Sequence, residues 1–127
     1  MKEDETILAI TSKEEIEKVV LKLKIFSFKN LKKKRYYELS LLQKNTNEKE
    51  LDEYFTKFDR IKLIFYRKRL SGYNNYDFHY EKDDGTYIVY SINLDKMPPE
   101  LINAFTSDKN FKNFLRIISK RYDKTLE

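Results

Sequence analysis

The chain has 127 residues, of which 40% are hydrophobic and 37% are charged. That length fits one domain over residues 1–127, and the apolar fraction is large enough to build its core. The sequence carries 26 cations against 21 acids, a formal net charge of +5, and no cysteine, which excludes a disulfide framework and a thiolate site. The charge balance favours attraction to nucleic acid or to acidic protein surfaces.

The N-terminal segment MKEDETILAI carries acidic residues where a secretion signal needs a basic region and a longer apolar stretch. Apolar runs elsewhere are far shorter than the roughly 20 residues that cross a bilayer. We therefore expect a cytoplasmic protein with no membrane segment.

Residues 6–10, TILAI, are apolar and β-branched, and they predict a strand. Ser12 follows, with Glu15 three residues later, which is the capping box that starts a helix. The next apolar residues repeat at helical spacing: Ile16, Val19, Val20, Leu23 and Phe26. A helix with one buried stripe is therefore expected.

Residues 28–43 are ambiguous. Tyr37, Leu39 and Leu41 alternate as in a strand, whereas Tyr37, Leu41 and Leu42 suit a helix. We favour the strand for this segment.

Asn47 and Glu50 repeat the capping pattern and predict the start of a second helix. Its apolar residues again follow helical spacing: Leu51, Tyr54, Phe55 and Phe58. This helix is expected to pack one face on the core.

From Arg60 onward the apolar period changes to two, as in strands. Alternation runs through residues 61–66, 76–81 and 87–92, with turn residues at 71–75 and 83–85. These segments predict a three-stranded antiparallel meander.

The double proline at residues 98–99 suits the start of a short helix that contains Leu101, Ile102 and Phe105. A final helix follows Ser107, with apolar residues on one side: Phe111, Phe114, Leu115, Ile118 and Tyr122. The predicted fold is α+β, with an antiparallel sheet made of the meander plus one or two N-terminal strands and packed by three to four helices.

Several chemistries are excluded by residue counts. With one histidine and no cysteine, neither a Ser-His-Asp or Cys-His site nor a zinc site is expected. Gly72 and Gly85 stand alone in turns, so no glycine-rich phosphate loop and no cofactor are expected. Asp77, His79 and Glu81 share one strand face and could ligate a hard metal, but we favour a solvated outer face and no metal site.

Two basic clusters adjoin aromatic residues, as on surfaces that follow a nucleic-acid backbone. The first contains Lys32, Lys33, Lys34 and Arg35, and the second contains Lys62, Arg67, Lys68 and Arg69 beside Tyr73 and Tyr76. Arg67 and Arg69 continue the parity of Ile61, Leu63 and Phe65, so we expect them beyond the core on an accessible rim. The alternative is that the tyrosines fill the sheet and the cations keep the domain in solution.

Metal-independent RNA cleavage needs a cation on the scissile phosphate and groups that transfer protons. Arg67 or Arg69 would supply the first, and His79 or Tyr80 the second. The order of basic strand, turn, aromatic strand, Asp-Gly, apolar strand and the segment DKMPPEL is similar to the C-terminal half of RelE/HigB-type ribosome-dependent RNase toxins. The resemblance covers about a third of the chain and ends where the final helix begins.

Our first hypothesis is a small non-enzymatic protein that engages nucleic acid or a nucleoprotein through a basic, tyrosine-rich sheet edge, as a phage or mobile-element accessory protein or inhibitor would. One alternative is a metal-independent endoribonuclease, and another is a module that binds an acidic protein partner. Pairing of strands at the ends of the sheet would also allow a homodimer.

Overall fold

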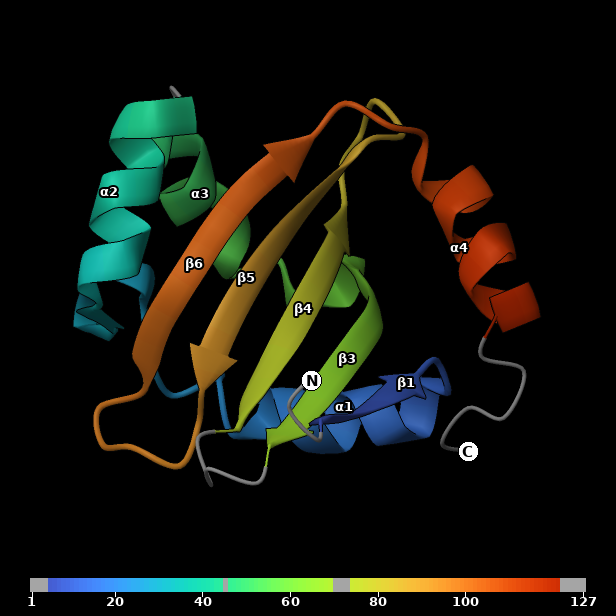
Figure 1. The fold of residues 1–127 in the computed structure, drawn as a ribbon, viewed down its shortest axis with the longest axis horizontal. Coiled ribbons are helices and arrows are strands. Elements are labelled where there is room, and N and C mark those ends of the chain that lie inside the picture. The colour runs from blue at the N-terminus through green and yellow to red at the C-terminus, as the bar shows by residue number, and fades with distance from the viewer. Residues whose placement is uncertain (1–4, 45, 70–73, 122–127) are drawn as a thin grey trace.

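A six-stranded mixed sheet forms the centre of the computed structural model, which describes residues 5–44, 46–69 and 74–121 (Figure 1). The strand order is β1-β3-β4-β5-β6-β2, and all neighbours are antiparallel except β2 and β6. The strands are β1 Glu5–Ile10, β2 Lys32–Lys33, β3 Ile61–Arg69, β4 Asn75–Glu81, β5 Tyr87–Asn93 and β6 Glu100–Ser107. The α+β class is confirmed, but the expected wholly antiparallel sheet is wrong, because the meander β3-β4-β5 continues into β6 and the parallel strand β2.

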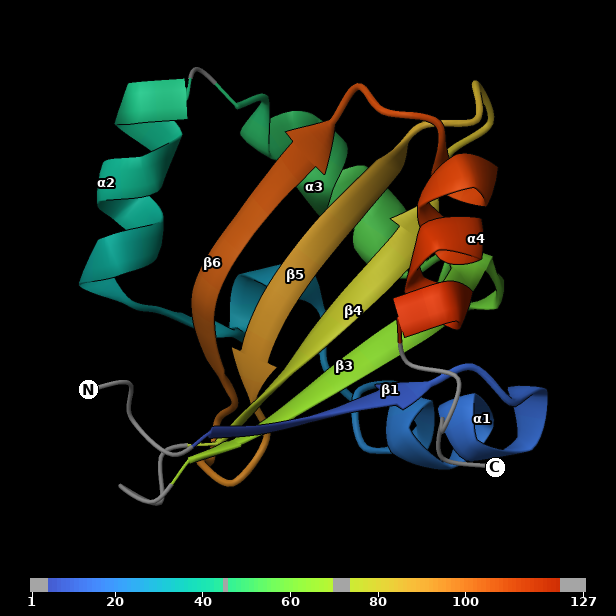
Figure 2. The same cartoon turned by 45° about the vertical axis from the view of Figure 1, so that its right-hand side comes forward.

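Four helices cover the two faces of the sheet unequally: α1 Lys13–Leu21, α2 Arg35–Lys44, α3 Glu48–Phe55 and α4 Phe111–Arg121. Residues of α1, α2 and α3 share a large hydrophobic core with one face, and α4 packs alone on the other face (Figures 1 and 2). The larger core includes Leu51, Phe55, Phe78, Tyr80 and Tyr90. The smaller core consists of Ala9, Leu63, Phe65, Tyr87, Val89, Phe111 and Ile118. Both faces of the sheet are therefore covered over part of their area.

The two helix starts predicted from capping residues, at Ser12 and Asn47, are confirmed. The Ser12 side chain accepts a hydrogen bond from the Glu15 amide at 3.2 Å, and Asn47 accepts from the Glu50 amide at 3.4 Å. Helix α1 ends at Leu21, earlier than expected, because the backbone then turns and places Leu23 in the core. Local capping chemistry thus determines where these helices begin, and packing determines where α1 ends.

The preference for a strand over residues 28–43 is wrong for most of that segment. A short 3₁₀ turn at Phe28–Asn30 precedes the two-residue strand β2, and α2 then begins at Arg35. Tyr37 is 1% exposed and Leu41 packs against the same core four residues later. Helical spacing of these two core contacts outweighs the alternation with Leu39, which is exposed.

The helix expected after the double proline is a strand instead. β6 pairs antiparallel with β5 along its length and parallel with β2. A bulge opposite Ser91 and Ile92 lets Leu101 and Ala104 face the larger core although they are three residues apart. That irregular spacing resembles a helical stripe in the sequence, which is why it misleads.

Strand β3 contributes to both cores through its normal alternation, and a second bulge changes the face of Ile61. The register with β4 shifts between Ile61 and Leu63, so Ile61 and Ile64 belong to the larger core while Leu63 and Phe65 belong to the smaller one. The expectation that Ile61, Leu63 and Phe65 share one face is wrong for Ile61.

Candidate ligand-binding hollow

The predicted basic surface on β3 is divided between the two faces of the sheet. β3 is an interior strand, since it pairs with β1 on one side and β4 on the other. Arg67 faces the α4 side with Phe65, and Lys68, the next residue, points to the opposite face and is exposed. The Arg69 side chain and all of Tyr73 lie outside the described residues. The structure therefore does not bring Arg67 and Lys68 together on one rim.

Two of the four cations at residues 32–35 interact with other groups of the chain. The Lys33 ammonium donates to the Phe28 carbonyl and lies 4.3 Å from the centroid of that ring, and burial lowers the pKa of Lys33. Lys34 pairs with Glu100 at 3.5 Å. The two remaining cations are exposed: Lys32 and Arg35.

The two described tyrosines with predicted roles are packed against the larger core. Tyr76 is half-buried, its ring centroid lies 4.7 Å from that of Tyr66, and burial raises its pKa. Tyr80 is fully buried and donates its hydroxyl hydrogen to the Phe55 carbonyl at 2.8 Å. The Tyr80 ring is too deeply buried to stack on a base, and it lies on the opposite side of the sheet from Arg67.

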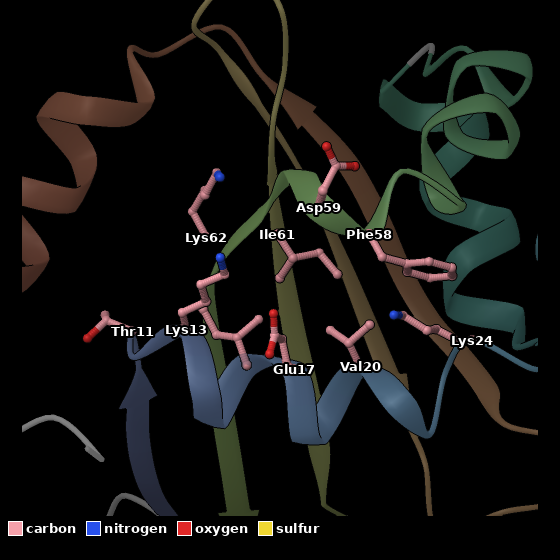
Figure 3. A pocket seen from close by; sticks show the side chains of 10 residues that line it. Thr11, Lys13, Glu17, Val20, Lys24, Phe58, Asp59, Ile61 and Lys62 are labelled. Carbon is pink, nitrogen blue, oxygen red and sulfur yellow. The ribbon is translucent and has the colours of Figure 1, made fainter.

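Lys62 lies at a different site, a groove of about 560 Å³ beside α1 (Figure 3). Lys13 and Lys62 stand at one side of this groove and Lys24 reaches in from the other, with the carboxylates of Glu17 and Asp59 between them. The apolar part of the lining is Ile16, Val20, Phe58 and Ile61. Because two carboxylates lie among three ammonium groups, the groove carries little net positive charge.

A second cavity, which we call the hollow, has a volume of about 630 Å³ and lies on the α4 side of the sheet. Its floor is the face of β3, β4, β5 and β6, and it reaches from Phe114 of α4 to Tyr36 of α2, which flank this face (Figure 2). Asp77, Ser91 and Asn103 stand directly opposite one another on adjacent strands. They form a row of polar side chains across a floor that is otherwise largely aromatic and aliphatic.

Asp77 is the centre of this polar row. One carboxylate oxygen accepts from Arg67 Nε at 2.6 Å, and the other accepts from Asn75 Nδ2 at 2.8 Å and Ser91 Oγ at 2.7 Å. The Asp77 side chain is 7% exposed and that of Arg67 is 31% exposed. A carboxylate this deeply buried requires such partners, so the charges of Arg67 and Asp77 balance each other inside the hollow.

His79 lies on the same floor and is 4% exposed. Its Nδ1 is 3.2 Å from the Leu63 carbonyl oxygen and 3.0 Å from the Asp77 carbonyl oxygen. Since both neighbours are acceptors, we assign the hydrogen to Nδ1, which leaves Nε2 as the acceptor of the neutral ring. Burial lowers the pKa of His79 to about 4, an effect that the nearby Asp77 carboxylate only partly opposes.

The expectation of a solvated outer face for Asp77 and His79 is therefore wrong. His79 is buried against Phe114 of α4, and Asp77 is buried among its hydrogen-bond partners on the sheet. Glu81, the third member of that set, is half-exposed. Across the described ranges, no group of three His, Asp or Glu side chains is arranged to hold a metal ion.

Aromatic rings form the walls of the hollow. Phe114 stacks on Tyr87 with centroids 5.0 Å apart and on the His79 ring at 5.7 Å. Phe65 meets His79 edge-on at 5.1 Å. Towards α2 the packing is looser, because Phe105 is half-exposed and Tyr36 is 60% exposed. The walls thus close at α4 and open towards α2.

Asn103 supplies the one polar atom of the row that lacks a partner in the described part of the chain. Its Oδ1 is buried and accepts no hydrogen bond there. A buried acceptor without a donor costs about 1–3 kcal/mol. Such an atom on the floor of a cavity indicates where a donor on a ligand or a water would bind.

Sequence reasoning identified Arg67 and His79 but missed Asn75, Ser91 and Asn103. A signal was present, since Asn75, Asp77 and His79 alternate along an aromatic strand. Asn103 could not be placed beside them, because its segment was expected to be helical.

None of the helices in the described residues has the length and apolar composition needed to span a membrane. No protein-family model, curated protein or solved structure matches the chain.

Proposed function

We propose that the chain is a non-enzymatic binding protein that takes an unpaired base of a single-stranded nucleic acid into the hollow. The observation that carries this proposal is the polar row between aromatic walls, with the buried Asn103 Oδ1 unpartnered. A base is planar, stacks on aromatic rings and presents donors along its edge. Stacking matches the aromatic walls, and the donors along the edge of the base match the acceptor on the floor.

Charge also favours a base over an anionic ligand. Arg67 and Asp77 cancel each other, and His79 is neutral at pH 7 because its pKa is about 4. An anion that entered this interior would lose its hydration without gaining a net opposite charge. An uncharged base pays no such cost, and the phosphates remain outside, where the formal charge of +5 attracts them.

The hollow is large enough to admit a base. A cavity of about 630 Å³ lies within the usual range of roughly 300–1,000 Å³ for small-ligand sites. A duplex keeps its bases stacked and paired, so it would not offer a base to this cavity. The proposal therefore predicts preference for single strands over duplexes of the same sequence.

Fluorescence anisotropy with labelled single-stranded DNA and RNA, about ten nucleotides long, tests the proposal. Asn103→Ala should weaken binding up to about tenfold through loss of one hydrogen bond, and Phe105→Ala should weaken it further through lost stacking. Thr106→Ala is the matched control, because Thr106 is exposed on the same strand and does not line the hollow.

Calorimetry with free nucleosides distinguishes binding of the base alone from binding that requires a nucleic-acid strand. If nucleosides bind with the same dependence on Asn103 and Phe105, the hollow reads the base itself and the strand adds phosphate contacts. If single strands bind but the three variants are indistinguishable, or if neither strands nor nucleosides bind, the proposal is wrong.

A second candidate function is a metal-independent endoribonuclease, because Arg67 and His79 line the same hollow. In that case Arg67 would contact the scissile phosphate, neutral His79 would accept at Nε2 the proton of the attacking ribose 2′-hydroxyl, and the leaving 5′-oxygen would take a proton from water. Incubation of labelled RNA with excess chelator separates this function from binding alone. Cleavage that His79→Gln abolishes would support the nuclease, whereas intact RNA supports simple binding.

A further inference from the structure

Helix α2 carries apolar side chains on two opposite faces. Tyr37 and Leu41 face the larger core, whereas Leu39 and Leu42 are 46% and 82% exposed. Arg35, Leu39 and Leu42 fall on one line of the helix, since they are four and three residues apart. We call these three residues the outer stripe of α2.

The other long helices of the fold present mainly charged outer faces. Exposed residues of this kind are Lys13, Glu14, Glu17 and Lys18 in α1 and Lys112, Arg116 and Lys120 in α4. Leu21 at the end of α1 and Ile117 of α4 are exceptions, 64% and 54% exposed, but each is the single large apolar side chain described as exposed on its helix. An apolar line along the outermost part of a helix indicates a surface that is covered by a partner.

Unpaired positive charge lies at the N-terminal end of the same helix. Lys29, Lys32 and Arg35 are exposed, and none of them forms an ion pair with the described residues. Cations at a helix N-terminus oppose the helix dipole. A carboxylate from outside the chain would pair with these cations and would also be favoured by the dipole.

These two features together select one class of occupant. A nucleic-acid strand would pair with the cations but leave Leu39 and Leu42 in water. A second copy packed antiparallel through its own α2 would bring Leu42 to the Arg35 end, and the acid of that helix, the exposed Glu38, would face Leu39 and not the cations. A segment that carries both acids and apolar side chains can pair with the cations and also cover the two leucines.

We propose that the outer stripe of α2 docks an acidic, amphipathic segment of another protein. Apolar side chains of that segment cover Leu39 and Leu42, and its carboxylates lie over the N-terminal end of α2 beside Lys32 and Arg35. This surface is separate from the polar row of the hollow, and the inference does not depend on base binding.

Selection from a random peptide library, with displayed peptides about four helical turns long, tests this proposal without assuming a partner sequence. Peptides are selected on the wild-type chain, and their affinities are then measured for Leu42→Ser, Arg35→Glu and the control Ile117→Ser. Leu42 and Ile117 are both exposed aliphatic side chains on helices, so the two serine variants should fold equally well. Circular dichroism verifies that they do.

We expect selected peptides to combine acidic and apolar residues, and Leu42→Ser and Arg35→Glu each to weaken binding about fivefold or more. Binding should weaken with salt, and Ile117→Ser should leave it unchanged. The proposal is overturned if no peptide is enriched, if enriched peptides are basic, or if the α2 variants bind as well as wild type. A dimer in light scattering that Leu42→Ser dissociates would also overturn it, in favour of a second copy.

Discussion

His79 gives a direct test of the hollow, because it is the only histidine in the chain and its ring is buried. Burial lowers its pKa from 6.5 to about 4, with Asp77 opposing the shift and Arg67 adding to it. The unfolded chain takes up a proton near pH 6.5, whereas the folded chain does so only near pH 4. Stability must therefore fall as the pH falls through that window.

The size of the effect follows from the shift. One pKa unit corresponds to about 1.4 kcal/mol, so a shift from 6.5 to about 4 lowers stability by on the order of 3 kcal/mol when complete. About 2 kcal/mol of this loss should appear between about pH 8 and pH 5. Carboxylates titrate mainly in the lower part of the window, so the histidine contribution has to be isolated by comparison.

Urea denaturation of the wild type and of His79→Gln, followed by circular dichroism from pH 8 to pH 4.5, makes that comparison. The glutamine variant cannot take up the proton, so the free-energy difference between the two proteins should shrink or reverse by about 2 kcal/mol as the pH falls to 5. Val89→Ala is the matched control, because Val89 is the cross-strand neighbour of His79 and does not titrate. Its stability should differ from wild type by the same amount at every pH.

Parallel pH profiles for wild type and His79→Gln would show that the ring is not desolvated as described. The same conclusion would follow if the imidazole resonances titrated near pH 6.5 in the folded protein. Either result would remove the argument that the interior of the hollow is uncharged at neutral pH.

Three further substitutions test the packing that supports the site. Asn47→Ala removes the cap on the Glu50 amide and should cost about 1 kcal/mol in urea unfolding. Tyr80→Phe leaves the Phe55 carbonyl without its donor and should cost about 1–3 kcal/mol while leaving any nucleic-acid binding unchanged; a selective loss of binding would contradict the placement of Tyr80. Gly85→Ala places a side chain at φ +89° and should cost on the order of 1–2 kcal/mol in thermal unfolding, although nothing crowds the added carbon.

Local signals in the sequence located the elements that local chemistry determines. The caps at Ser12 and Asn47 and the period-two strands from Arg60 onward needed no tertiary information. The segments that failed, residues 28–43 and 100–107, are those whose pattern depends on a distant partner. β2 exists only because it pairs with β6, and the spacing within β6 reflects the bulge that it forms with β5.

The candidate site was predictable only in part for the same reason. Arg67, Asp77 and His79 were recognised as polar residues on a hairpin, but the burial of Asp77 and His79 was not, because periodicity cannot reveal which distant side chains pack over that face. The partners of Asp77 likewise come from neighbouring strands, whose register the sequence pattern does not specify. Arg69 and Tyr73 remain predictions, since the Arg69 side chain and Tyr73 lie outside the described part of the chain.

The attachment of α4 has a consequence for how anything enters the hollow. Its first residue, Phe111, donates its amide hydrogen to the Gly85 carbonyl at 2.8 Å, and its described apolar side chains pack on the smaller core. Release of this one helix would remove a wall of the cavity while the six strands and the other three helices kept their packing. Local opening of α4, at a free energy below that of global unfolding, would therefore widen the entrance with the least loss of packing elsewhere.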